Sequence, residues 1–362
     1  MTIPLFKVFM TPSAEVRVAE VLKSLYIGQG TKVDQFEEEL KRTFQLSEEI
    51  ITVNSGTSAI DLALHMIGVG KGDEVITTPI TCTATNSNLV NRGATPVWAD
   101  VNPYTGVIDP NDVEKKITKK TKAIIAVNWG GVMPDYTILR SFDIPVIEDA
   151  AHGPYWSSRV RGNYITWSFQ AIKHLTCGDG GALVSPDPDR ARLLRWYGLD
   201  RRSSKNFRCE QNIQEIGYKY HMNDIAAVIG LANLPHLRFT VLSSRTNATV
   251  YTSELKQHIS KTLLYVPEID NNSSYWIYTV LVDNPAAFME HMKKREIDTS
   301  PVHARNDKHD AFKRVQKKWR LHGNSLPGVD FFDSHQVSIP NGWWLTQRDK
   351  EAIMSAVKEY AI

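Results

Sequence analysis

Hydrophobic residues recur at helical spacing in two N-terminal segments. Within residues 34–44 the apolar positions lie four residues apart, with acidic and basic residues between them, which predicts an amphipathic helix. Residues 58–67 place isoleucine and leucine on one face, and Gly68 follows directly. A glycine in that position is typical of a helix end, so a second helix is predicted there.

From residue 72 onward, short apolar runs alternate with helical patterns. The runs predicted as strands are 75–78, 95–99, 122–127, 145–148, 165–169 and 181–185. The helical patterns are 111–117, 135–141 and 188–197. This alternation favours an α/β fold with a mostly parallel sheet between helices, and such sheets bind ligands at the carboxyl ends of their strands.

The C-terminal third has a different order of elements. An apolar helix is predicted over 225–234, and a long helical pattern continues toward residue 257. Strands are predicted near 277–282 and 337–339, which indicates a separate, smaller α+β unit. We therefore predict a large domain, 1–240, and a small C-terminal domain, 241–362, with a boundary accurate to roughly ten residues.

Composition indicates a cytoplasmic protein rather than one that binds nucleic acid or membranes. The 362 residues are 42% hydrophobic, and 42 basic against 40 acidic residues give a charge of only +2, too small to attract polyanions. Three scattered cysteines, without a CxxC pair, predict a reducing compartment, no disulfide framework and no metal site. No apolar run reaches the ~18 residues of a membrane span, and the N-terminus does not resemble a signal peptide.

Three segments carry candidate chemistry. Residues 54–58, directly before the second predicted helix, are small or hydroxylic, so their backbone N–H groups are suited to a phosphate, although an ordinary helix cap has the same composition. One predicted strand ends in Glu148, Asp149 and, three residues later, His152, where the acids can also cap a turn. Lys173 lies between Ser168 and a glycine cluster at 178–181. A lone lysine is usually a surface residue, so its importance depends on the other two segments.

Taken in order, seven segments resemble the DegT/DnrJ/EryC1/StrS family of sugar-nucleotide aminotransferases. The resemblance covers nearly the whole chain, and the segments are 3–6, 28–37, 54–57, 72–77, 93–97, 147–152 and 217–230. It implies the type I aminotransferase fold, with a large domain that binds pyridoxal 5′-phosphate (PLP) and a smaller C-terminal domain.

The resemblance also implies roles for individual residues. Lys173 occupies the position of the lysine that holds the PLP aldehyde as a Schiff base and later moves protons, which requires a pKa lowered by burial or a neighbouring cation. Asp149 occupies the position that keeps the ring nitrogen protonated, and His152 the position beside the ring. Because successive strand residues alternate, Glu148 is expected to point to the other face.

The phosphate of PLP is expected to contact two segments. Gly56 and Thr57 would supply backbone groups and the Thr57 hydroxyl, and Ser58 and Ser168 would complete the set, as the resemblance implies. In the family a residue of the second subunit near the Gly-Tyr motif often contributes as well. Lys219 is the candidate here, with Asn223 as the alternative.

Two positions depart from the family pattern, and two more are candidates for substrate contact. Cys82 stands where many members have an aromatic residue against the PLP ring, so stacking would be weaker or come from elsewhere; we interpret Cys82 as a packing residue rather than a nucleophile. Trp129 lies in a loop expected near the substrate and differs from most relatives. His303 falls near a substrate-facing histidine, and Arg305 could receive a diphosphate.

The resemblance implies a PLP-dependent aminotransferase that moves an amino group from L-glutamate to a nucleotide-linked keto-deoxysugar in a ping-pong reaction. A homodimer with shared active sites is expected. One alternative is a sugar dehydratase of the same fold, in which a histidine replaces the lysine; His174 would take that role if the alignment slipped by one residue. The other is a non-catalytic binding or regulatory relative, which would have lost the lysine, the acid or the phosphate loop.

Overall fold

A seven-stranded sheet forms the larger part of the molecule. The computed structural model describes residues 2–156, 159–202, 210–318 and 325–362; Cys209 lies outside them. The strands are β1 Ile50–Val53, β2 Glu74–Thr77, β3 Thr95–Trp98, β4 Thr121–Val127, β5 Val146–Asp149, β6 Tyr164–Ser168 and β7 Gly181–Val184. Their spatial order is β1-β7-β6-β5-β4-β2-β3. Strand β7 is antiparallel to both neighbours, and the remaining pairs are parallel, so the predicted, mostly parallel sheet is confirmed.

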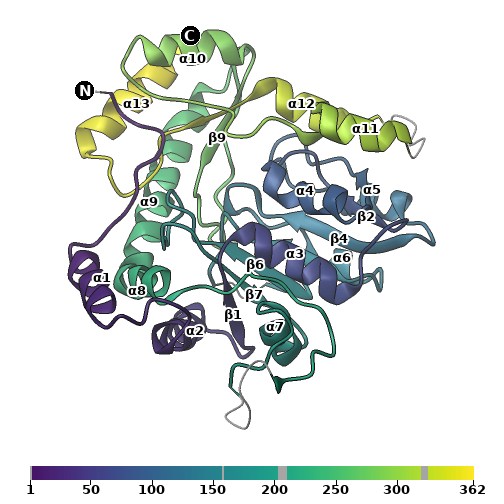
Figure 1. Ribbon diagram of the computed structural model, residues 1–362. Coiled ribbons are helices and arrows are strands. Elements are labelled where there is room, and N and C mark those ends of the chain that lie inside the picture. The colour runs from purple at the N-terminus through teal and green to yellow at the C-terminus, as the bar shows by residue number, and fades with distance from the viewer. Residues whose placement is uncertain (1, 157–158, 203–209, 319–324) are drawn as a thin grey trace.

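Helices cover both faces of this sheet (Figure 1). They are α1 Ser13–Lys23, α2 Thr31–Phe44, α3 Gly56–Ile67, α4 Thr83–Asn91, α5 Pro110–Lys116, α6 Tyr136–Arg140, α7 Pro188–Leu194, α8 Asp224–Asn233 and α9 Leu237–Leu255. Ile50 belongs to the core under α2 and α8, whereas Ile51 belongs to the core under α3 and α7. Successive strand residues point to opposite faces, so two adjacent isoleucines help fill two cores.

A second, three-stranded sheet organises the C-terminal part. Its antiparallel order is β10-β9-β8, with β8 Leu263–Tyr265, β9 Tyr278–Val282 and β10 Gln336–Ile339. The helices here are α10 Pro285–Lys293, α11 Asp310–Lys318, α12 Pro327–His335 and α13 Gln347–Tyr360. Short 3-10 turns occur at Trp129–Gly131, Leu234–His236, Lys256–His258 and Asn306–Lys308. The proposed boundary near residue 240 falls within α9 and stays a prediction.

The N-terminal segment joins the two parts. Ile3 forms a bridge with Ile297, and the Trp344 indole donates a hydrogen bond to the Pro4 carbonyl at 3.1 Å. Figure 1 shows this segment passing along α9 to α1 at the far end of the molecule. It thereby brings Phe6 to the region where the two sheets face each other.

The helical run Asp224–His258 is long and apolar enough, by composition, to cross a membrane. However, 56% of its most apolar window is buried inside the protein, and a core helix of a soluble protein meets the same criteria. The run supplies Ala227, Leu231 and Val241 to the core against α2. Its apolar character is therefore accounted for by packing within the fold.

Candidate active site

A cavity of about 430 Å³ lies at the carboxyl end of β5 and is closed by the C-terminal part of the chain. Its walls come from the start of α3, the segment before α4, the end of β5, the segment between β6 and β7, and two C-terminal segments. The predicted residues on the wall are Gly56, Thr57, Cys82, Asp149, His152, Ser168, Lys173 and His303. Residues that lie far apart in the sequence thus meet around one space.

Lys173 reaches the cavity from the turn between β6 and β7. Its backbone N–H donates to the Gln170 carbonyl at 2.9 Å, which fixes the turn. Burial lowers the pKa of the Lys173 ammonium to about 7, although Asp149 and Cys82 act in the opposite direction. A substantial fraction of this amine is therefore neutral at physiological pH, as a proton carrier requires.

His174 does not share this cavity. Its Nε2 lies 3.1 Å from the Ser244 hydroxyl of α9, and its ring packs against Tyr155. Burial lowers the pKa of the imidazole to about 3, so the ring is neutral. The structure places Lys173, and not its neighbour, on the wall of the site.

Asp149 is held at the floor of the cavity and is 3% exposed. The Thr85 hydroxyl donates to Oδ2 at 2.8 Å, and the Ala151 N–H donates to Oδ1 at 3.1 Å. Burial raises the pKa of the carboxyl group, and these two hydrogen bonds oppose that rise. Glu148 points the other way, as alternation predicts, and forms a buried ion pair with Arg161 at 2.7 Å.

The start of α3 forms one end of the cavity, where Ser55, Gly56 and Thr57 lie on the wall. Ser55 caps the helix by accepting from the Ser58 N–H at 3.1 Å. The N–H groups of Gly56 and Thr57 belong to the first turn, where a helix has no partners of its own for them. A Cβ on Gly56 would lie 2.9 Å from the Ser168 Cβ, so a glycine is needed for Ser168 to approach. The Ser58 hydroxyl is instead engaged with Asn54 at 2.7 Å.

Two histidines line the cavity, with a tryptophan behind them. The Gly130 N–H donates to His152 Nδ1 at 3.3 Å, which places the proton of the neutral ring on Nε2. Burial, with Lys173 and His303 nearby, holds the pKa of His152 well below its usual value, and burial lowers that of His303 to about 4. The centroid of the Trp129 ring lies 5.8 Å from the centroid of each imidazole, but Trp129 does not itself line the cavity.

The aromatic surface of the cavity comes from residues that the sequence had not singled out. Cys82 is on the wall, as expected, at the start of α4. Phe6 and Trp276 are also on the wall, and their rings stack with centroids 5.0 Å apart. A tryptophan just before a predicted strand is expected to be a core residue, so only its contacts in the structure show that it belongs to the site. The same holds for Thr85, whose place in the site is shown only by its contact with Asp149.

Three expected contacts lie elsewhere in this single chain. The Arg305 guanidinium binds Asp307 at 2.7 Å and Asp330 at 2.5 Å, so it is already neutralised and does not line the cavity. Asn223 caps α8 by accepting from the Ala226 N–H. The Lys219 ammonium lies over the Trp196 ring, 4.3 Å from its centre. The expectation that Arg305 receives a diphosphate is therefore not supported by this geometry.

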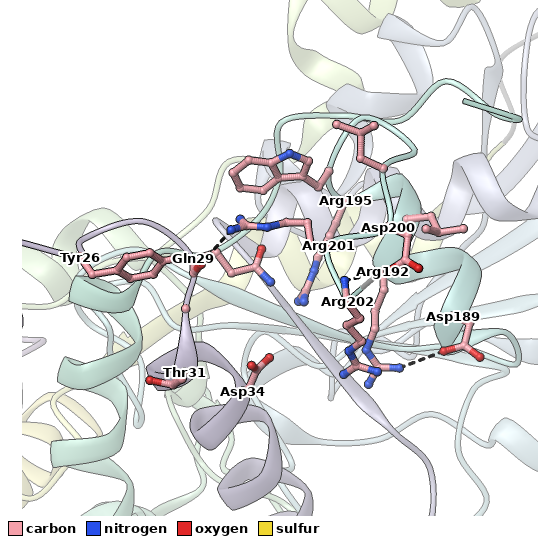
Figure 2. A pocket seen from close by; sticks show the side chains of 14 residues that line it. Tyr26, Gln29, Thr31, Asp34, Asp189, Arg192, Arg195, Asp200, Arg201 and Arg202 are labelled. Carbon is pink, nitrogen blue, oxygen red and sulfur yellow. Dashed lines mark hydrogen bonds and ion pairs between the residues drawn. The ribbon is translucent and has the colours of Figure 1, made fainter. Parts of the chain in front are cut away.

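A second cavity of about 460 Å³ lies near the start of α2 and shares no wall residue with the first among the residues described. Figure 2 shows the arginines that line it, two of them directed at acceptors of the same chain. Arg192 pairs with Asp189 at 3.4 Å, and Arg201 donates to the Gln29 carbonyl at 3.0 Å. Arg192 also pairs with Glu49, and Arg195 with Glu37, so part of the positive charge of this cavity is balanced by carboxylates of the same chain.

The first cavity fits PLP in its donor set. It brings together an amine of depressed pKa, a buried carboxylate and a helix N-terminus beside Ser168, which match the aldehyde, ring nitrogen and phosphate of that cofactor. Within the described ranges no cluster of three metal-ligating side chains occurs. The fold and the site thus define a PLP-dependent enzyme with the type I aminotransferase fold.

The chain belongs to the DegT/DnrJ/EryC1/StrS aminotransferase family, which residues 10–358 match. It is 34% identical over 286 residues to the spore coat polysaccharide biosynthesis protein SpsC of Bacillus subtilis, covering 75% of this chain and 73% of that protein. It resembles the crystal structure of AtS13 from Actinomadura melliaura, with 37% identity, a TM-score of 0.90 and coverage of 99% and 98%. The corresponding values for the sugar aminotransferase CalS13 from Micromonospora echinospora are 32%, 0.88, and 99% of both chains. As a member of this family, the chain uses PLP as its cofactor.

Proposed function

We propose that the protein transfers an amino group from L-glutamate to a keto-deoxysugar carried on a nucleoside diphosphate, in the cytoplasm, for amino-sugar or polysaccharide biosynthesis. The observation that carries this proposal is the placement of Lys173, with a pKa of about 7, in one cavity with Asp149 and the start of α3. The polysaccharide name of SpsC and the sugar aminotransferase CalS13 support a sugar as the acceptor.

Each wall residue has a distinct task in this proposal. Gly56, Thr57 and Ser168 bind the phosphate, whereas the N–H and the hydroxyl of Ser58 are engaged with Ser55 and Asn54. The Asp149 carboxylate favours a proton on the ring nitrogen, so that PLP, when bound, withdraws electrons from the carbon that loses its proton. Lys173 holds the cofactor and, once displaced, carries a proton to or from the substrate carbon.

Substrate recognition is assigned to the C-terminal wall of the cavity. The His303 Nε2 is buried and, among the residues described, has no hydrogen-bond partner, so a sugar hydroxyl or phosphate oxygen can satisfy it. Trp129 packs against His303 and His152 and orients both rings. Arg305, in contrast, is not assigned to substrate recognition, because its guanidinium forms ion pairs with Asp307 and Asp330.

A homodimer is part of the proposal, supported by an apolar surface after α1. Leu22, Leu25, Tyr26 and Ile27 are each about half exposed or more, and Leu25 reaches 88% while holding a left-handed φ of 59°. Such a surface is typical of a protein interface. The partner subunit's Lys219 would then complete the phosphate site. Sedimentation of Leu25→Glu tests this: a wild-type dimer and a monomeric variant are expected.

The reaction itself is tested by incubating the purified protein with PLP, L-glutamate and a nucleotide-linked keto-sugar. Formation of 2-oxoglutarate and an amino-sugar nucleotide, identified by mass spectrometry, is expected, with ping-pong kinetics. Lys173→Ala should lack the absorbance of the lysine-bound cofactor and lose activity by several orders of magnitude. A deoxygenated sugar without any amino-sugar would instead establish the dehydratase reaction.

A further inference from the structure

Trp276 contacts two consecutive residues of the lysine-bearing turn. Its indole N–H donates to the Ile172 carbonyl at 2.9 Å, and the Lys173 ammonium lies 3.4 Å from the centre of its ring. Trp276 is 4% exposed and comes from the segment directly before β9. One side chain from the C-terminal part of the molecule thus holds both the backbone and the amine of a turn that belongs to the large sheet.

The indole is itself fixed in position. Phe6 stacks on it with centroids 5.0 Å apart, and the His152 ring packs at 4.2 Å. A cation over the face of tryptophan is attracted by the negative charge of the ring face, and this attraction is stronger where water is excluded. The arrangement therefore favours one location for the Lys173 amine among the many that its four-carbon chain permits.

The other groups that act on the Lys173 amine come from four segments. Asp149 and Cys82 favour its charged form, whereas burial favours the neutral form. His152, His174 and His303 also lie within its electrostatic reach, and the pKa of each is lowered, so all three rings are neutral at pH 7. Trp276 differs from all of these because it attracts the ammonium without carrying a charge that titrates.

We propose that Trp276 is a positioning residue for Lys173: its ring face holds the ε-ammonium that forms when the lysine, released from the cofactor, takes up a proton. The ammonium then stays at the wall of the cavity instead of dispersing over rotamers, ready to return its proton. The inference rests on the proposed role of Lys173. It also assigns the main aromatic surface of the site to Trp276, in a chain that has Cys82 at the other candidate position.

The test is a double-mutant cycle on the full-length chain freed of cofactor. Thermal unfolding midpoints are measured for the wild type, Trp276→Leu, Lys173→Met and the double variant, at about pH 6 and pH 9. Only the ammonium is attracted by the ring, and its pKa is about 7. Near pH 6 the fall in the unfolding midpoint of the double variant should therefore differ by about 2 °C from the sum of the falls in the two single variants, whereas near pH 9 the falls should be additive. Trp276→Phe, which keeps a weaker ring face, should retain part of the coupling.

Trp98→Leu is the matched control, because Trp98 lies in the same apolar cluster but packs edge-on against Phe312 at 5.6 Å. Trp98→Leu should lower the unfolding midpoint, and this fall should be additive with that of Lys173→Met at both pH values. Additive losses for Trp276 near pH 6, or a coupling that persists near pH 9, would overturn the proposal.

A second measurement serves if Trp276→Leu does not fold. With Trp276→Phe, the rate at which the absorbance of the lysine-bound cofactor appears after PLP is added to the cofactor-free chain should reach half its maximum at a lower pH, because the weaker ring face stabilises the ammonium less. An unchanged midpoint would refute the positioning role while leaving the aminotransferase proposal intact. That proposal fails on a different result, an unaltered cofactor spectrum in Lys173→Ala.

Discussion

The Thr85 hydroxyl of α4 donates a hydrogen bond to the Asp149 carboxylate of β5 across 2.8 Å. Both side chains are almost fully buried, so neither can exchange this partner for water. The Thr85 hydroxyl is in turn 2.7 Å from that of Thr81. A short chain of hydroxyls therefore stabilises the ionised form of Asp149, the acid that we propose faces the PLP ring nitrogen.

Thr85→Val is expected to reduce kcat roughly tenfold, because a hydrogen bond to a buried charge is lost without a change in side-chain volume. The variant should also raise the pKa of Asp149, since Thr85 lowers it. Activity depends on the ionised carboxylate and is lost as pH falls through this pKa. The acid limb of the pH–rate profile should therefore move to higher pH.

The control for this experiment is Thr85→Ser, which keeps the hydroxyl and removes a methyl group. It should restore both the rate and the position of the acid limb. If Thr85→Val and Thr85→Ser gave the same pH–rate profile, the hydrogen bond would have no effect on the pKa of Asp149.

The Lys173 pKa of about 7 predicts the pH dependence of the proton-transfer half-reaction. The neutral amine accepts the proton, so the single-turnover rate with L-glutamate should rise with pH, reach half its maximum near pH 7 and level off about one pH unit higher. Cys82 raises the pKa of Lys173. Cys82→Ala should thus lower this midpoint, measured by stopped-flow absorbance at a series of pH values.

Cys177→Ala is a matched control, because Cys177 is fully buried in the core beneath α2 and α8 and does not line the cavity. Its midpoint should equal that of the wild type. A shift of equal size in both variants would mean that the effect arises from packing and not from the thiol of Cys82.

The sequence predicted β2 to β7, β9 and β10 because each is a short apolar run, whereas β1 and β8 were not predicted. Strand β4, predicted as 122–127, spans Thr121–Val127, and α3 ends at Ile67, with Gly68 as its C-cap at a φ of 81°. Helices α1, α4, α10, α12 and α13 were not predicted. Helix α4 begins at Thr83 with many threonine and asparagine residues, so its apolar stripe is weak.

Whether a site residue was predicted depended on how local its signal is in the sequence. Asp149 and Gly56 were found because each belongs to a local motif whose chemistry can be read over a few positions. Trp276 and Thr85 were missed because their partners lie 104 and 64 residues away. The prediction for Arg305 could not take account of its ion-pair partner Asp330 for the same reason, since Asp330 is 25 residues further on.

Arg305→Gln is therefore expected to affect stability more than catalysis. The Arg305 side chain is 7% exposed and pairs with Asp307 and Asp330, so the loss should cost about 3 kcal/mol of unfolding free energy, toward the low end for a broken buried pair. The KM values for the sugar nucleotide and for glutamate should both stay within about twofold. A selective rise in the sugar-nucleotide KM would return Arg305 to the substrate site.

His303→Ala is expected to raise the KM for the sugar nucleotide roughly tenfold and the KM for glutamate much less. His303 lines the cavity, and its buried Nε2, within the described part of the chain, lacks a partner, so a polar substrate group would gain about one hydrogen bond there. Because burial lowers the pKa of His303 to about 4, the ring is neutral from pH 6 to pH 8. The contribution of His303 to sugar binding should therefore be the same across that range.

His291→Ala provides the comparison, since that ring contacts the Ala356 carbonyl at 2.8 Å outside the cavity. It should leave both KM values unchanged. Initial rates at fixed glutamate and varied sugar nucleotide, measured at pH 6 and pH 8, distinguish the cases. If the effect of His303→Ala were present at pH 6 and absent at pH 8, the residue would act as a cation, and the neutral, hydrogen-bonding role derived from its burial would be wrong.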